Sequence, residues 1–227
     1  MSGRKVSVSA FILGILILGN NSLGVKLCDK ISERSGSALD KIKILAVVGS
    51  LRKNSLNRQL ALIVKDIIGN RADFELLEYD DVPIMNEGIE FPAPEPVKRV
   101  REKVKSADAI WFFTPEHNHF FPSALKNVID WLSRPTGEGG PPILSKKPAC
   151  VSGISLGMNG TALAQDHLIT LINFLDMVVM NVPRVTIPNA MQQMDDQGRL
   201  KLNETSYSFV KDQAEAFLEF VRGRIKK

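Results

Sequence analysis

The sequence predicts an α/β fold, in which a parallel sheet of buried strands is covered by helices on both faces. Two observations from Lys41 onward support this prediction. Short runs of β-branched and apolar residues, of the kind found in strands buried on both faces, alternate with longer segments of helical periodicity. Clusters of proline, glycine and polar residues separate these runs. Such alternation is typical of a three-layer α/β sandwich.

Five segments have the composition of buried strands. The clearest is Ile42 to Val48, a continuous run of β-branched and apolar residues broken only by Lys43. The other four are expected at Phe74–Leu77, Ala109–Phe113, Pro148–Ile154 and Met177–Met180, with a possible continuation of the last at Val185–Thr186. Five parallel strands suit the flavodoxin-like order 2-1-3-4-5.

Five segments between and after these strands have helical periodicity. In the segment Ser55–Ile68, apolar residues recur every three or four positions, as on the buried face of a helix. The other helices are expected at Pro96–Ser106, Ser123–Leu132, Thr161–Phe174 and Glu204–Ile225. The segments Tyr79–Pro96 and Ser133–Lys147 are rich in proline and glycine and are expected to be loops.

Composition and charge narrow the class of function. The chain has 227 residues, of which 44% are hydrophobic and 24% charged, as in an ordinary globular domain. Its net charge is +4. The first forty residues hold five Lys/Arg and three Asp/Glu and so carry +2 of this charge. Because the remainder is nearly balanced, nucleic-acid binding is not expected.

Cysteines and histidines give little sign of a metal or disulfide site. Cys28 and Cys150 are far apart and do not form a disulfide framework, and Cys150 lies in an apolar run typical of a buried structural thiol. His117 and His119 have a spacing that a metal could use. No cysteine or second carboxylate cluster accompanies them, so no metal site is predicted.

Residues 1–40 differ from the rest and are expected to form an extension to a domain at residues 41–227. Arg4 and Lys5 precede the uncharged apolar run Val6–Leu18, which resembles part of a signal peptide and is shorter than the ~20 residues of a membrane span. Three interpretations stay open: an export or anchor segment, an amphiphilic appendage, or an upstream start that adds non-native sequence. A cytoplasmic location is expected, with membrane contact through residues 6–18 as the alternative.

The predicted topology indicates where a ligand would bind. In open parallel sheets, ligands bind beyond the carboxyl ends of the strands, where the strand order reverses. The loops after the first, third and fourth strands are therefore expected to meet at one site. These loops are named here the first, second and third loop.

The first loop, GSLRKNSLN, runs from Gly49 to Asn57 and leads into a helix. A helix N-terminus offers unpaired N–H groups and a positive dipole end, which suit a phosphate. Gly49 permits a tight turn, Ser50, Ser55 and Asn57 can donate to phosphate oxygens, and Arg52 adds positive charge. The GxGxxG and GxxxxGK[ST] motifs are both absent. The alternative is an ordinary capped helix with a surface arginine.

The other two loops suit a flat ring. In the second loop Pro115 ends the strand, and the backbone of Glu116, His117 and Asn118 can contact the edge of a planar heterocycle. The third loop, GISLGMNG, has three glycines that permit a ligand to approach the backbone closely, and the alternative is a flexible connection. Together the loops predict a ligand that has both a phosphate and a flat ring. Three aromatic residues near the second loop are expected in the core or at an interface: Phe120, Phe121 and Trp131.

Three stretches together resemble the NADPH-dependent FMN reductase family, which includes bacterial quinone and chromate reductases of flavodoxin-like fold. They are GSLRKNSLN, TPEHN with LKNVIDWLSRP, and LINFLDMVVMNVP. The resemblance covers about Lys41 to the C-terminus. It implies non-covalently bound FMN, NADH or NADPH as electron donor, and two-electron reduction of quinone, chromate, azo or flavin acceptors. It also implies a homodimer or homotetramer.

The resemblance assigns roles to the loops. The FMN phosphate would be held by Ser50, Arg52, Ser55 and Asn57, beside Gly49. The isoalloxazine ring would be lined by Pro115, Glu116, His117 and Asn118, and closed from the other side by Ser155 and Gly157. No side chain is assigned as catalytic, because FMN carries the chemistry.

Some residues differ from the family pattern or have no assigned role. His117 stands where the family usually has tyrosine, and we hypothesise that it tunes the flavin or a quinone oxygen. The chain has Gly160-Thr161-Ala162-Leu163 where the family often has Gly-Gly-Ala-Arg. Asp166 and Arg184 are hypothesised to pair across a subunit interface, with two separately solvated charges as the alternative.

Two other classes of function remain at this point. One is a one-electron carrier like flavodoxin, which the basic residues Arg52 and Lys53 and the absence of an acidic domain disfavour. The other is a non-enzymatic binding protein or sensor that has kept the fold, because fold alone does not determine function.

Overall fold

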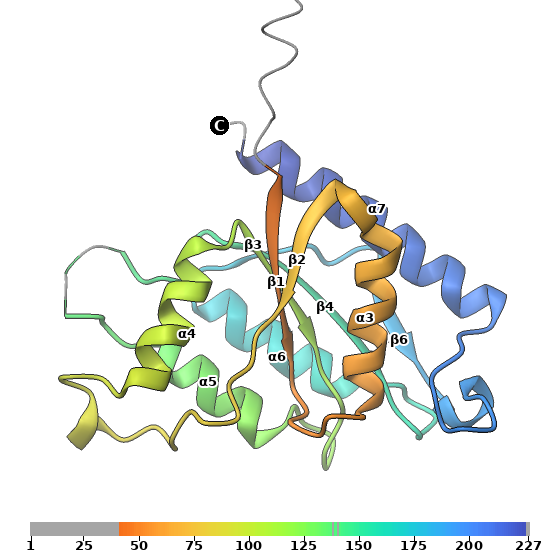
Figure 1. The fold of residues 1–227 in the computed structure, drawn as a ribbon, viewed down its shortest axis with the longest axis horizontal. Helices are drawn as coiled ribbons and strands as arrows, with labels where there is room; N and C mark the ends of the chain where they lie inside the picture. Colours follow the sequence, from red (N-terminus) through yellow and green to blue (C-terminus); the bar gives the residue numbers. More distant parts are fainter. Residues whose placement is uncertain (1–40, 138, 140, 226–227) are drawn as a thin grey trace, which may run out of the picture. The chain divides into compact units, whose positions relative to one another are not determined.

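A computed structural model describes residues 41–225 apart from 138 and 140. The expected extension at residues 1–40, with its apolar segment and Cys28, lies outside the described residues. The described chain is arranged in three layers, with a central sheet between two layers of helices (Figure 1). This confirms the predicted class of fold.

All strands of the sheet run parallel, in the predicted order β2-β1-β3-β4-β5. The strands are β1 (Ile42–Val48), β2 (Ala72–Leu76), β3 (Ala109–Phe113), β4 (Pro148–Ile154), β5 (Val178–Val179) and β6 (Val185–Ile187). Thus β1, β3 and β4 have the bounds expected from the sequence, whereas β2 begins two residues earlier than expected.

The fifth position of the sheet is divided between two short strands. β5 pairs with the start of β4 at Pro148 and Ala149, and β6 pairs with the end of β4 from Ser152 to Ile154. Pro183 lies between β5 and β6 and has no N–H group to donate to a ladder. The Gln213 side chain bridges this gap, because its Nε2 donates to Pro183 O at 3.0 Å and to Val151 O at 3.2 Å.

Helices cover both faces of the sheet (Figure 1). One face packs against α3 (Leu56–Ile68) and α7 (Glu204–Ile225), and the other against α4 (Glu95–Ser106), α5 (Ser123–Ser133) and α6 (Ala162–Phe174). Three short 3-10 helices lie in the connections: η1 (Gly69–Arg71), η2 (Glu87–Ile89) and η3 (Ala190–Gln193). The helix bounds agree with the sequence prediction to within one residue, and η2 interrupts the loop expected at Tyr79–Pro96.

Each face of the sheet has its own hydrophobic core. On the side of α3 and α7, Trp111 stacks on Phe113 and meets the edge of Phe217 at 5.0 Å between ring centroids. The Trp111 indole N–H donates to Ser152 Oγ at 2.7 Å, so the ring is buried without an unpaired donor. Cys150 is fully buried, as predicted, and burial raises the pKa of its thiol well above the usual value.

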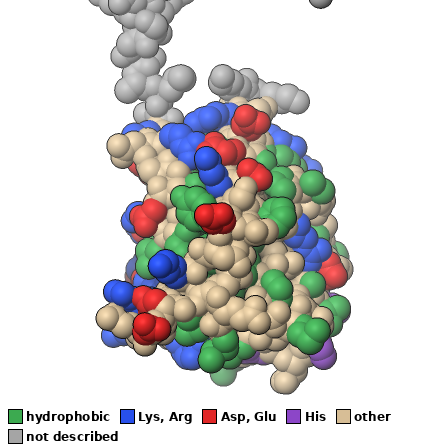
Figure 2. Space-filling view, turned by 90° about the vertical axis from the view of Figure 1, so that its right-hand side faces the viewer, with side chains coloured by type: hydrophobic (Ala, Val, Ile, Leu, Met, Phe, Trp, Pro, Cys, Tyr) green, Lys and Arg blue, Asp and Glu red, His purple; other side chains and the backbone are tan. Residues whose placement is uncertain are grey.

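The outer surface on the side of α3 and α7 carries no large patch of charged side chains of a single sign. Figure 2 shows Lys and Arg side chains interspersed with Asp and Glu, with hydrophobic side chains scattered among them. In the part of the chain that the structure describes, no helix has both the length and the apolar character required to cross a membrane.

Candidate functional site

A cavity of about 640 Å³ lies at the carboxyl ends of the central strands, where the first, second and third loops meet. This is the place that the topology predicts for a ligand. The predicted cofactor-binding residues line it, except Asn118. Further residues line the cavity that were not predicted from the sequence, among them Pro122, Ser123 and Ala124 at the start of α5. Their position within the stretch Thr114–Pro135, between β3 and the first turn of α5, is a signal that could have identified them.

Gly49 lies where the first loop leaves β1, and its N–H donates to Phe113 O at 2.8 Å. A Cβ at this position would lie 3.0 Å from Pro115 Cδ and 3.3 Å from Leu125 Cδ2. Glycine suits this position because the side chains of the second loop and of α5 pack closely against it. Its backbone does not have the positive φ that would make the turn itself depend on glycine.

The N-terminus of α3 opens into the cavity with unpaired donors. Ser55 caps the helix, since its Oγ accepts from Arg58 N at 3.0 Å, and its hydroxyl hydrogen is left to donate to a ligand. Among the described residues, the backbone N–H groups of Leu56 and Asn57 have no hydrogen-bond partner. The Arg52 side chain is exposed and also has no partner within that part of the chain. This arrangement of donors at a helix N-terminus is suited to an anion.

The Asn57 side chain was expected to donate to a phosphate, but it forms hydrogen bonds with the protein backbone instead. Its side chain is buried, with 3% exposure. Nδ2 donates to Ile154 O at 2.9 Å, and Ile154 N–H donates to Asn57 Oδ1 at 3.1 Å. The amide thus joins the first turn of α3 to the last residue of β4, from which the third loop starts. In this structure the Asn57 side chain holds two loops together, and its backbone N–H has no partner among the described residues.

The second loop makes a tight turn from His117 to Phe120. His117 N donates to Phe120 O at 2.9 Å and Phe120 N donates to His117 O at 3.0 Å. The two central residues, Asn118 and His119, have φ of 52° and 61°, which histidine and asparagine tolerate better than most residues. This turn points the exposed Asn118 away from the lining and leaves His117 on it.

The three aromatic residues near this loop have different environments. Phe121 and Trp131 are buried, with 4% and 1% exposure, and belong to the protein interior as expected. Phe120 is 44% exposed and stacks on the His167 ring, with 4.3 Å between centroids. Phe120 therefore remains on the surface beside the second loop.

The glycines of the third loop serve mainly the packing of the protein itself. A Cβ on Gly153 would lie 2.0 Å from Thr161 Oγ1 and 2.4 Å from Thr114 O. Gly160 has φ of 61°, and a Cβ there would lie 3.1 Å from Ile187 N. Of the three glycines, only Gly157 lines the cavity. The expectation that all three serve the approach of a ligand is therefore wrong for Gly153 and Gly160.

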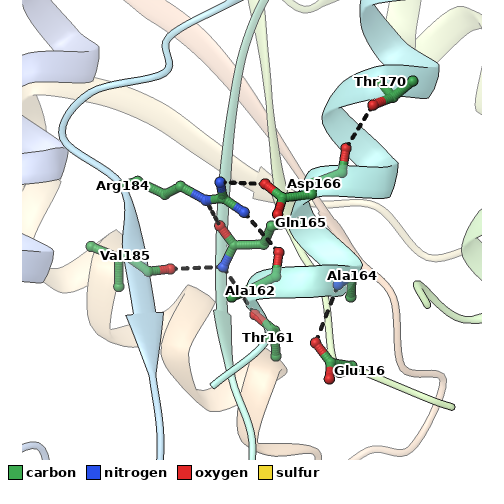
Figure 3. A network of polar contacts seen from close by, with 9 residues as sticks. All are labelled: Glu116, Thr161, Ala162, Ala164, Gln165, Asp166, Thr170, Arg184 and Val185. Atoms are coloured by element: carbon green, nitrogen blue, oxygen red, sulfur yellow. Dashed lines mark hydrogen bonds and ion pairs between the residues drawn. The ribbon is translucent and has the colours of Figure 1, made fainter. Parts of the chain in front are cut away.

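A polar network surrounds the start of α6 (Figure 3). Arg184 donates to Asp166 Oδ1 at 2.7 Å, to Gln165 Oε1 at 2.9 Å and to Ala162 O at 2.8 Å. The hypothesis that Asp166 and Arg184 pair across a subunit interface is wrong, because the two side chains pair within one chain. The sequence separation of eighteen residues hid this contact, which depends on the packing of α6 beside the segment before β6.

The geometry indicates a site for a phosphate-bearing ring, and comparison with known proteins identifies the family. The sequence profile of the NADPH-dependent FMN reductases matches residues 42–192. An NAD(P)H-dependent FMN reductase of Pseudomonas aeruginosa is 38% identical over 184 residues, which cover 81% of this chain and 97% of that protein. A quinone reductase of Pseudomonas putida is 37% identical over 180 residues, which cover 79% and 94% of the two chains.

A solved structure agrees with these sequence matches. The flavoenzyme FerB of Paracoccus denitrificans, an NAD(P)H:acceptor oxidoreductase, superposes with a TM-score of 0.72 and 34% identity, covering 80% of this chain and 98% of that one. The chain belongs to the NADPH-dependent FMN reductase family. It is an NAD(P)H-dependent, FMN-containing oxidoreductase of flavodoxin-like fold.

Proposed function

We propose that the cavity holds FMN, with the phosphate on the first loop and the isoalloxazine ring between the second and third loops. The strongest support for this proposal is the set of unpaired donors at the start of α3. The unpaired N–H groups of Leu56 and Asn57, at the positive end of α3, form one wall of a cavity of about 640 Å³ that also includes Arg52. An anion bound there would satisfy donors that have no partner among the described residues.

Each loop has a part in this arrangement. Ser50 and Ser55 donate from their hydroxyls to phosphate oxygens, and Arg52 adds a charge-assisted contact at the open side. Pro115, Glu116 and His117 form one wall for the ring, and Ser155 and Gly157 form the facing wall. When bound, FMN would provide the redox chemistry: it can accept hydride from NAD(P)H and can pass two electrons to an acceptor.

The residues of the chain bind and orient the reactants, and no side chain acts as an acid or base in this proposal. The family relatives act on quinones or flavin, and we propose the same small-molecule acceptors here, with azo compounds and chromate as further candidates. His117 is exposed at the lining and is the side chain placed to meet an acceptor. An unchanged kcat/KM for a quinone in a His117→Phe variant would contradict this role of His117.

Assembly as a homodimer or homotetramer is part of the same proposal. Large apolar side chains remain exposed at the end of α6 and after β5, among them Phe174 with 85% exposure and Val182 with 80%. Exposed apolar groups of this size are more stable when another surface covers them. A monomeric mass for the full chain, by light scattering at micromolar concentration, would contradict this assembly.

The placement of the phosphate is tested by comparing FMN with riboflavin, which lacks the phosphate. We expect the full chain to bind FMN at least ~100-fold more tightly, because several charge-assisted hydrogen bonds of about 1.5–3 kcal/mol each are made only by FMN. Arg52→Ala should weaken FMN binding and leave riboflavin binding unchanged, as measured by quenching of flavin fluorescence. Arg224→Ala, on the far end of α7, is the matched control. Equal affinities for FMN and riboflavin would place the phosphate elsewhere.

A further inference from the structure

Among the described residues, Glu116 is the one carboxylate on the lining of the cavity, and its side chain is held by the start of α6. It belongs to the second loop, and its side chain is only 12% exposed. Its Oε2 accepts a hydrogen bond from Ala164 N at 3.2 Å (Figure 3). Ala164 is the third residue of α6, forty-eight positions further along the chain.

This contact supplies a cap that α6 does not have from its own sequence. The N-cap residue Thr161 makes no side-chain capping bond, because its Oγ1 accepts from Gln165 Nε2 at 2.9 Å instead. The first backbone N–H groups of a helix have no partner within the helix. Glu116 satisfies one of them and places a negative charge at the positive end of the α6 dipole.

The same contact joins the two walls proposed for the flavin ring. The second loop carries Glu116, and the third loop ends at Thr161, where α6 begins. Arg184 and Gln165 hold the first turn of α6 to the segment around β6 from another side (Figure 3). The start of α6 is therefore a fixed point, and Glu116 anchors the second loop to it.

Glu116 also sets the charge at this end of the cavity. The single Lys or Arg side chain among the lining residues is Arg52, on the first loop at the phosphate end. His119 Nδ1 lies 3.4 Å from Glu116 Oε1, on a side chain that is 73% exposed. A ring between the second and third loops would thus lie beside a carboxylate, and a reduced flavin carries more negative charge than an oxidised one.

We infer that Glu116 is a positioning residue that anchors the second loop on α6 and lowers the reduction potential of the bound FMN through its charge. This rests on the proposed FMN site. The anchor keeps the second loop, which forms one of the two walls proposed for the flavin ring, in place before FMN binds. The charge favours oxidised over reduced flavin, so that the reduced enzyme passes its electrons readily to weak oxidants.

Two substitutions separate the charge from the anchor. Glu116→Gln retains an oxygen that can accept from Ala164 N–H and removes the charge. We expect FMN affinity within about twofold of the natural chain and a ~tenfold shift of the redox equilibrium towards reduced flavin, which is about 30 mV for a two-electron couple. The measurement is equilibration with a reference dye during slow enzymatic reduction at pH 7. Asp166→Asn is the control, because that carboxylate pairs with Arg184 and is 60% exposed. It should leave the potential unchanged.

Glu116→Ala removes both functions. We expect a ~tenfold loss of FMN affinity, and a fall of about 2–4 °C in the Tm of the FMN-free protein, as loss of a helix cap predicts for a domain of this size. Glu116→Gln should restore that Tm. An unchanged potential in Glu116→Gln would overturn the electrostatic role, and an unchanged apoprotein Tm in Glu116→Ala would overturn the anchor. Failure of the natural chain to bind FMN would instead overturn the proposed function, while the Tm comparison would still test the anchor.

Discussion

Replacement of Gly153 by alanine is expected to lower the free energy of unfolding by about 3 kcal/mol. The added Cβ would lie 2.0 Å from Thr161 Oγ1 and 2.4 Å from Thr114 O. Both neighbours are completely buried, so neither can move without disturbing the ends of β3 and β4 or the start of α6. Because the second and third loops begin at these ends, FMN binding should be lost as well. Urea unfolding and flavin fluorescence measure the two effects.

Gly223→Ala is the matched control for this substitution. Gly223 lies in α7, and apart from the helix's own backbone no atom of the described residues would lie within 4 Å of a Cβ there. Alanine should leave FMN binding unchanged and should not destabilise the protein, with a gain of up to ~1 kcal/mol because glycine is unfavourable within a helix. A Gly153→Ala protein as stable as the natural chain would show that the contacts among β3, β4 and α6 are less constrained than the structure indicates.

Asn57→Ala is expected to cost about 2–4 kcal/mol of stability and to weaken FMN binding strongly. The substitution leaves the buried N–H and C=O of Ile154 without partners, and an unsatisfied buried backbone group costs ~1–3 kcal/mol. It also frees the start of α3, where we propose the phosphate binds, from the end of β4, where the third loop begins. Urea unfolding and FMN titration again provide the measurement.

Asn54→Ala is the control for the effect of losing an asparagine from the same loop. Its side chain is exposed and has no hydrogen bond among the described residues, while its backbone carbonyl accepts from Gln59 Nε2. We expect a change within ~0.5 kcal/mol and unaltered FMN affinity. If Asn57→Ala behaves in the same way, the bridge to Ile154 does not organise the site.

Local signals in the sequence predicted the elements of this fold. The run Ile42–Val48 and the helix Glu204–Ile225 have their predicted bounds, the first from a continuous apolar run and the second from apolar residues that recur along the segment. Ser55 was expected as the first residue of the helical segment Ser55–Ile68, and it is the N-cap of α3 (Leu56–Ile68). The division of the fifth strand was predicted less well, since it depends on Pro183 and on the Gln213 side chain from α7.

The sequence predicted which loops form the candidate site, but it did not predict the side-chain contacts that hold these loops together. Strand order alone places the three loops together, and five parallel strands suit that order. In contrast, the partner of Asn57 is ninety-seven residues away and that of Glu116 is forty-eight residues away. Residue types could not indicate that these two side chains are used to hold the loops, because such contacts arise only from the packed structure.

The most direct test of the proposed site is the visible spectrum of the purified full chain, after incubation with FMN and removal of the excess, before and after anaerobic addition of NADPH or NADH. We expect retained flavin absorbance near ~450 nm that bleaches with at least one nucleotide and returns when a quinone is added, because the bound cofactor carries both half-reactions. A chain that retains no flavin, or whose flavin stays oxidised with both nucleotides, would contradict the proposed FMN site and its function as a reductase.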